Sequence, residues 1–98
     1  MDALKRLQDW YARQCDEEWE HTYGVTIDTL DNPGWRVKIN LKGTALESTP
    51  LDTVDVNHGD ADWWMCRREG TDFFGVGDPT KLQTILEHFL AWAERAGS

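Results

Sequence analysis

The most constraining feature of this sequence is a strict two-residue alternation over residues 35–42. Apolar side chains occupy the odd positions and polar side chains the even ones: Trp35, Arg36, Val37, Lys38, Ile39, Asn40, Leu41 and Lys42. This period is typical of a strand with one buried face. The turn formers of residues 30–34 precede it and a weaker alternation covers residues 23–29, so we predict an antiparallel hairpin. In that hairpin Asp28 can face Arg36 or Lys38.

Helical spacing flanks this region on both sides. Between residues 2 and 18, Leu4, Leu7, Tyr11 and Cys15 recur as one helix face, with Trp10 beside it. Near the other end, an Asp-Pro pair suits a helix start, with the Asp as cap and the Pro at the first helical position. The pair and the apolar face that follows it are Asp78, Pro79, Leu82, Ile85, Leu86, Phe89 and Ala93, with Trp92 nearby.

Three further strands are expected at residues 52–57, 62–69 and 73–76, separated by turn-forming segments. Because four apolar residues follow one another in Trp63–Cys66, we predict that their strand is covered on both faces. The chain is therefore predicted to be a single domain over residues 1–98 of the α+β class. We expect an antiparallel meander of about five strands, flanked by an N-terminal and a C-terminal helix.

Acidic residues are concentrated in two blocks. The net charge is −8; residues 14–35 carry six carboxylates and residues 43–66 carry five, both without Lys or Arg, and three bases lie in residues 36–42 between them. Such blocks repel phosphates and anionic lipids, so neither nucleic acid nor membrane is expected as a direct partner. They favour a basic protein partner. The alternative is that the acidity serves only solubility.

We expect a cytoplasmic protein, because the sequence shows no membrane-spanning apolar run and no signal peptide. Its two cysteines, Cys15 and Cys66, do not form the framework of a small secreted domain, and in a reducing compartment both are expected to be buried thiols. Whether they ever pair stays open.

Residues with catalytic or metal-binding chemistry are scattered. Five side chains could bind zinc, but no CxxC or HxxxH spacing groups them: Cys15, His21, His58, Cys66 and His88. Cys15 with His21, or Cys66 with His58, could serve as nucleophile and base, but neither pair lies in a recognisable motif. The Gly75–Gly77 segment lacks the further Gly and the Lys of a phosphate loop, which favours a tight strand-to-helix turn.

The six tryptophans are expected to have different roles. Trp35 and Trp92 are assigned to the core, and Trp19, between Glu18 and Glu20, is expected to be exposed. Trp63 and Trp64 must point in opposite directions from one strand, so one of them could be a partly exposed anchor.

The segment LQDWYARQCDEEWEHTYGVTIDTLDNPGW, residues 7–35, resembles the opening of the immunity protein 53 family of bacterial polymorphic toxin systems. The resemblance continues through FFGVGDP, residues 73–79, and the aromatic last helix. The marks that carry it are Trp19-Glu20 and Pro33-Gly34-Trp35. It implies a small cytosolic protein that binds and inhibits one cognate toxin domain, is not an enzyme, and has no catalytic residues or cofactor.

The partner expected on this resemblance is a toxin domain. The charge of the chain makes a basic toxin the better fit, and a nuclease is a hypothesis because nucleases hold phosphates in basic clefts. The chain is expected to be a monomer or a weak dimer. The predicted toxin-binding residues are Asp16, Glu17, Glu18, Trp19 and Glu20 in one block and Asp52, Asp55, Asp60 and Asp62 in a second.

Two alternatives stay open. One is a small enzyme or ligand-binding domain with a carboxylate-lined pocket near His21 and Asp31, which a deep cleft would favour. The other is an acidic mimic of nucleic acid that acts on a host DNA-binding protein. This last alternative differs from toxin inhibition only in its partner.

Overall fold

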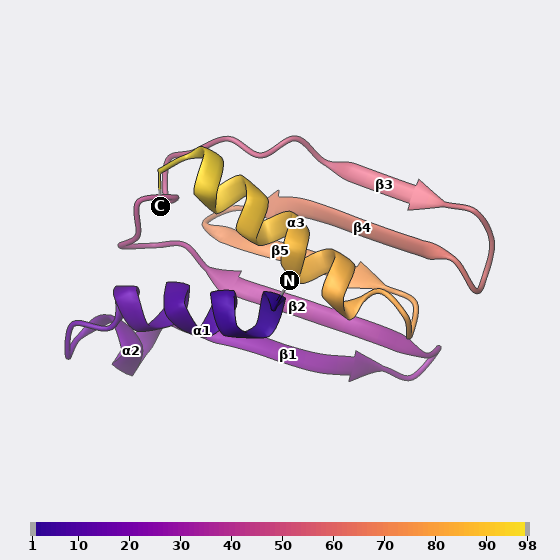
Figure 1. Ribbon diagram of the computed structural model, residues 1–98, viewed down its shortest axis with the longest axis horizontal. Helices are drawn as coiled ribbons and strands as arrows, with labels where there is room; N and C mark the ends of the chain where they lie inside the picture. Colours follow the sequence, from indigo (N-terminus) through magenta and orange to yellow (C-terminus); the bar gives the residue numbers. More distant parts are fainter. Residues whose placement is uncertain (1, 98) are drawn as a thin grey trace.

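The computed structural model describes residues 2–97 and shows one antiparallel sheet with its longer helices on one face (Figure 1). This confirms the predicted α+β class. The elements are α1 (Ala3–Gln14), α2 (Trp19–Thr22), β1 (Val25–Leu30), β2 (Gly34–Asn40), β3 (Val54–Asn57), β4 (Trp63–Glu69), β5 (Asp72–Gly77) and α3 (Leu82–Arg95). The molecule is elongated, with extents of 41 × 28 × 23 Å.

The strands lie in the order β1-β2-β5-β4-β3, and all neighbours are antiparallel. The predicted hairpin of β1 and β2 is confirmed, and its register places Asp28 opposite Arg36, whose guanidinium binds the Asp28 carboxylate. The predicted meander is wrong. Strand β2 pairs with β5, and β3 lies at the far edge of the sheet beside β4.

The connection from β2 to β3, residues 41–53, explains this strand order. Its residues Leu41 and Leu46 are completely buried. The Arg68 guanidinium on β4 donates hydrogen bonds to the carbonyl oxygens of Leu46 (2.9 Å), Glu47 and Thr49. A tight turn from β2 into β3 could not bury both leucines, so burial of apolar surface favours the path that carries the chain to the far edge.

Helix α1 is shorter than predicted and buries a different face. It ends at Gln14 because the backbone of Cys15 is extended. The predicted apolar stripe is wrong at two positions, since Leu4 is 61% and Tyr11 is 38% exposed. Helix α1 buries the predicted Leu7 together with Ala3 and Trp10, which lie one position before Leu4 and Tyr11.

Helix α3 begins at Leu82, three residues after the position predicted from Pro79. Asp78 does not cap this helix. Its buried carboxylate accepts hydrogen bonds from the backbone N–H of Trp63 (2.8 Å) and from the backbone N–H and hydroxyl of Thr80 (2.7 and 2.6 Å). The bond from the Thr80 hydroxyl, followed by those from the backbone, holds the pKa of Asp78 well below its ordinary range. Asp78 thus joins the start of β4 to the turn after β5.

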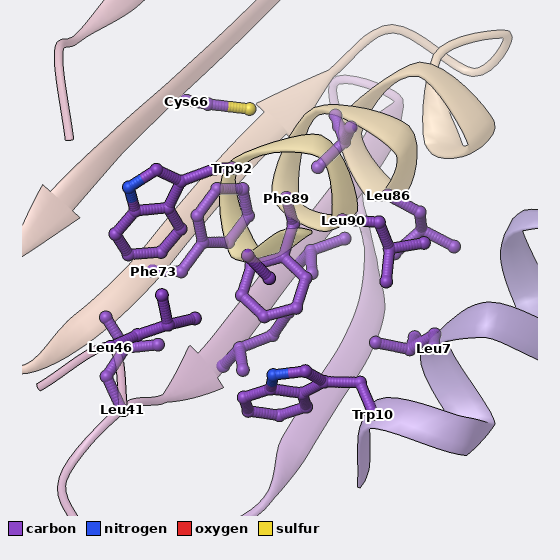
Figure 2. Close-up of a cluster of buried hydrophobic side chains, with 14 of the residues drawn as sticks. Leu7, Trp10, Leu41, Leu46, Cys66, Phe73, Leu86, Phe89, Leu90 and Trp92 are labelled. Carbon is purple, nitrogen blue, oxygen red and sulfur yellow. The ribbon is translucent and has the colours of Figure 1, made fainter. Parts of the chain in front are cut away.

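The core lies between the sheet and the two long helices (Figure 2). The Phe89 ring meets Trp10 of α1 edge-to-face at 5.0 Å and Phe73 of β5 at 5.1 Å. Helix α3 can approach β5 closely because a Cβ on Gly75 would lie 2.5 Å from Cγ2 of Ile85. The buried residues of α3 confirm its predicted apolar face and add Leu90: Ile85, Leu86, Phe89, Leu90, Trp92 and Ala93.

The other face of the sheet, which we call the open face, has no helix packed on it within residues 2–97 (Figure 1). The prediction that β4 is covered on both faces is therefore wrong. Trp64 points towards α3, where its ring lies 5.4 Å from that of His88, and Trp63 points to the open face. The register places further side chains there: Leu30, Arg36, Lys38, Asp55, Met65, Arg67, Phe74 and Val76.

Candidate protein-binding surface

The acidic segment, residues 16–20, forms a turn capped by its own carboxylates. Asp16 accepts hydrogen bonds from the backbone N–H groups of Trp19 (2.9 Å) and Glu18 (3.0 Å). Glu20 accepts from the N–H groups of Asp16 and Glu17, both at 2.9 Å. These backbone hydrogen bonds lower the pKa of both carboxyl groups. The largest contribution comes from the Trp19 N–H for Asp16 and from the Glu20 N–H for Glu20. In the part of the chain that the structure describes, the Glu17 and Glu18 carboxylates have no such partner.

Trp19 is buried, so the prediction that it is an exposed aromatic is wrong. Its side chain is 6% exposed, and its indole Nε1–H donates to the carbonyl oxygen of Lys42 at 2.8 Å. Its ring lies 6.2 Å from Trp10 and 6.3 Å from Tyr23, between centroids. Trp19 therefore packs α2 against α1 and joins it by a hydrogen bond to the segment that follows β2, and it presents almost no surface to a partner.

The four aspartates of the second acidic block do not form one surface. Asp55 lies on the open face of β3, and Asp60 lies in the turn between β3 and β4. Asp62 is bound by the Lys81 ammonium at 2.9 Å. Asp52 lines a separate hollow beside α3. The structure thus places Asp55, Asp60 and Asp62 in the β3–β4 hairpin, with Asp62 paired to Lys81, and separates Asp52 from them.

Charged side chains on the open face are paired along most of its length. Partly exposed apolar side chains, among them Met65, Phe74 and Val76, lie between them. The ion pairs are Arg36 with Asp28, Lys38 with Asp72 (3.7 Å) and Arg67 with Glu69. Asp55 and Asp60 make no ion pair with any residue in 2–97. Uncompensated negative charge is therefore found at the β3–β4 hairpin.

A hollow of about 320 Å³ lies between the β1–β2 turn and the β3–β4 hairpin, and we call it the hairpin hollow. It is lined by Asn32, Asn57, Gly59, Asp60 and Trp63. The Asn57 side-chain oxygen accepts a hydrogen bond from the N–H of Gly59 at 3.0 Å, which orders the turn. The sequence left open which of Trp63 and Trp64 could be the partly exposed anchor. The structure selects Trp63, which lies on the same face of β4 as the charged Arg67 and Glu69.

Neither His21 with Asp31 nor Cys66 with His58 is brought together, and the Cys15 thiol donates to the carbonyl oxygen of Tyr11 at 3.4 Å. His21 precedes β1 and Asp31 follows it, so a strand about 20 Å long separates them. The structure therefore does not bring these two residues to one pocket. Cys66 is buried in the sheet, and burial raises the pKa of its thiol to about 12, while His58 is exposed in a turn. Cys15 and Cys66 are both free thiols, but only Cys66 is buried as predicted, and Cys15 is half-buried. Residues 2–97 contain no group of three or more His, Cys, Asp or Glu placed to hold a metal ion.

Another hollow, of about 460 Å³, lies between the 41–53 connection and α3, and its polar lining includes Asp52, His88 and Arg95. The His88 Nε2 atom is buried there without a hydrogen-bond partner. Burial, followed by the charge of Arg95, lowers the pKa of His88. A neutral imidazole that packs against Trp64 is best explained as part of the packing between α3 and the sheet.

The arrangement is therefore a sheet face with an apolar centre and acidic groups at one end. A family model described as Immunity protein 53 matches residues 4–94. The chain belongs to the immunity protein 53 family. This confirms the resemblance predicted from the sequence and supports an immunity function, with inhibition rather than catalysis as the indicated role. No curated protein and no solved structure matches the chain significantly.

The residues that carry the family resemblance hold the fold together. Trp19 is buried, and the Trp35 indole Nε1–H donates to the carbonyl oxygen of Pro79 at 3.0 Å. A Cβ on Gly34 would lie 2.3 Å from the carbonyl oxygen of Gly77, so a glycine is needed where β2 begins beside β5. These marks identify the immunity protein 53 fold and leave the contact surface to be inferred from exposed residues.

No helix within residues 2–97 combines the length and the apolar character that crossing a membrane requires.

Proposed function

We propose that this chain is an immunity protein that binds one cognate toxin domain and neutralises it by covering the surface that the toxin needs for its activity. The observation that carries the proposal is the family match over residues 4–94. The open face supports a binding role, because its partly exposed Trp63, Met65 and Phe74 are flanked by charged groups. An apolar centre within a polar rim is the usual composition of a protein interface.

The contact surface in this proposal is the open face together with the β3–β4 hairpin. Trp63 takes the anchoring role that the sequence suggested for Trp19, since buried aromatic anchors dominate interface energies. Asp55 and Asp60 supply the acidic rim. A complex of standard size would cover about 800 Å² of this face.

The acidic segment has a different role in this proposal. Glu17 and Glu18, with Asp16 and Glu20 beside them, lie at the end of the molecule away from the β3–β4 turn (Figure 1). We propose that they steer a basic toxin towards the chain without entering the contact. Charges outside an interface act mainly on the association rate, so raising the salt concentration should slow association more than it speeds release.

A nuclease is the toxin class that this charge distribution suits best. Enzymes that cleave nucleic acid hold phosphates in basic clefts, and an acidic surface can occupy such a cleft or its rim. We propose that the chain acts in the cytoplasm of the producing cell, as a monomer or a weak dimer. An acidic mimic directed at a host DNA-binding protein would present the same surface and is separated from this proposal by the identity of the partner.

The test is growth rescue. A toxin domain encoded next to this chain is expressed in a sensitive host with the wild-type protein or with the Asp55→Lys, Asp60→Lys variant, and Glu17→Lys, Glu18→Lys serves as the matched control. We expect rescue by the wild type and the control but not by the first variant, with all three folded by circular dichroism.

If both variants rescue, the proposed contact surface is wrong and immunity stands. If the wild type fails although toxin and chain are both expressed, the proposed function is overturned for that toxin, and a host DNA-binding partner becomes the better explanation.

A further inference from the structure

The hairpin hollow combines side chains that together suit one particular ligand group. The indole of Trp63 supplies an aromatic surface, Asp60 supplies a carboxylate, and Asn32 supplies a carboxamide oxygen, while the Asn57 oxygen already accepts the Gly59 N–H at 3.0 Å. Its volume of about 320 Å³ is sufficient for one long side chain and too small for a folded element. A planar cation that donates several hydrogen bonds is the group that can use all of these surfaces at once.

The charge around the hollow favours a cation. Asp60 and Asp31, which adjoins Asn32, make no ion pair within residues 2–97. The Lys81 ammonium is already held by Asp62 at 2.9 Å and by Asp78 at 3.0 Å. A cation entering from outside therefore meets carboxylates that lack a counter-ion.

The hollow is held in shape by the backbone of the hairpin. The N–H of His58 donates to the carbonyl oxygen of Asp62 at 2.8 Å, and the N–H of Asp62 donates to that of Gly59 at 3.2 Å. At the base of the hairpin, the Trp63 N–H is held by the Asp78 carboxylate at 2.8 Å. A site whose shape is fixed before binding loses little conformational entropy when the ligand arrives.

From this geometry we propose that the hairpin hollow is a socket for one arginine side chain of the toxin. The proposal rests on the toxin-binding function proposed above and names the chemistry of its contact. The guanidinium stacks on the Trp63 indole and donates to the Asp60 carboxylate and to the Asn32 side-chain oxygen. Arginine suits this site better than lysine, because its planar fork can stack on an aromatic ring and bind a carboxylate with two donors.

The first test measures the affinity of purified chain for the toxin domain encoded next to it, inactivated at its catalytic residue. Asp60→Asn should weaken binding about tenfold to a hundredfold, because it removes the counter-charge of a partly desolvated cation. Trp63→Leu keeps an apolar side chain but removes the aromatic surface, and it should weaken binding about tenfold. The matched control, Glu18→Gln at the other end of the molecule, should stay within about threefold of the wild type.

The outcomes separate the socket from the proposed function. Tight binding by the wild type together with unchanged binding by Asp60→Asn and Trp63→Leu would overturn the socket and leave the function standing. No binding by the wild type would overturn both. If Trp63→Leu does not fold, Asp60→Asn decides alone, since Asp60 is exposed in a turn and its replacement is isosteric.

A second test identifies the arginine. Each toxin arginine is replaced by lysine and by alanine, and each variant is measured against the wild-type chain and against Asp60→Asn. For one arginine, Asp60→Asn should no longer weaken binding once that arginine is replaced by alanine. This loss of additivity is what a double-mutant cycle shows for two residues in contact. The lysine variant at that position should recover only part of the affinity. If Asp60→Asn weakens the binding of every toxin arginine variant as much as it weakens that of the wild-type toxin, the socket does not hold an arginine.

Discussion

The acidic segment and the β3–β4 hairpin resemble each other in sequence, since each places carboxylates next to a tryptophan, but they differ in what those residues do. At the acidic segment, Trp19 is buried and Asp16 and Glu20 bind backbone N–H groups of their own turn. At the hairpin, Trp63 lies on the open face and Asp60 has no partner within residues 2–97. Figure 1 shows the two regions at opposite ends of the long axis.

The comparison shows that an acidic residue beside a tryptophan is not by itself evidence of a binding site. A carboxylate that already accepts hydrogen bonds from the backbone contributes to the stability of its own turn, and it must give up those bonds to accept others. A tryptophan whose indole N–H already has a carbonyl partner is part of the packing. The functional candidates are therefore the groups whose capacity for interaction is still unused.

The largest expected effect is a loss of stability when the buried tryptophan, rather than the one on the open face, is replaced. Trp19→Ala removes a buried indole and its hydrogen bond to Lys42, and it should lower the free energy of unfolding by about 3–5 kcal/mol. Trp63→Ala, on the open face, should lower it by about 1 kcal/mol. Urea unfolding followed by circular dichroism measures both. Equal losses would show that the two tryptophans are equally structural and would remove the basis of the comparison.

The connection that sets β3 beside β4 gives the next largest effect. Arg68→Met removes the guanidinium donor from the carbonyl oxygens of Glu47 and Thr49 and leaves that of Leu46 with only the Thr49 N–H, so it should cost about 2 kcal/mol of unfolding free energy. The matched control is Arg67→Met, the neighbouring residue on the open face, with an expected loss below about 1 kcal/mol. The same urea titration compares them, and a larger loss for Arg67→Met would contradict the role given to Arg68.

A pH-dependent effect is expected at the base of the hairpin. Because the folded protein lowers the pKa of Asp78 below the unfolded value near 3.8, its ionised carboxylate stabilises the fold above that pH, and this stabilisation is lost as the pH falls further. Asp78→Asn should therefore be less stable than the wild type at neutral pH, and the difference should narrow below pH 4. Thermal unfolding between pH 2 and pH 7 measures it, and a constant difference would show that the charge of Asp78 is not responsible.

The smallest effect concerns the unpaired carboxylates of the acidic segment. Glu17→Gln, Glu18→Gln should change the unfolding free energy by less than about 0.5 kcal/mol, because neither side chain makes a hydrogen bond or ion pair with residues 2–97. Toxin association should slow about two- to threefold at low salt, with an unchanged dissociation rate. Stopped-flow mixing at two salt concentrations measures both rates. A faster dissociation would place the acidic segment inside the contact.

Much of the fold could be predicted from short-range patterns. The alternation over residues 35–42 and the turn formers before it were sufficient for the β1–β2 hairpin and limited the partner of Asp28 to Arg36 or Lys38; the register of the folded strands selects Arg36. The family could be recognised because its marks, Trp19-Glu20 and Pro33-Gly34-Trp35, are residues that this fold requires. The contact surface could not be predicted in the same way, because exposure depends on which distant segments cover a residue.

The sequence alone determined the α+β class, the existence of the two long helices, the two acidic blocks and the family. These properties follow from periodicity, composition and local motifs, which act over a few residues. Only the tertiary structure decided that β5 lies beside β2, that Trp19 is buried while Trp63 lies on the open face, and that Asp60 is left without a counter-charge. The reason is physical: burial and ion pairing depend on contacts between segments far apart in the chain, as the complete burial of Leu41 and Leu46 in the 41–53 connection illustrates.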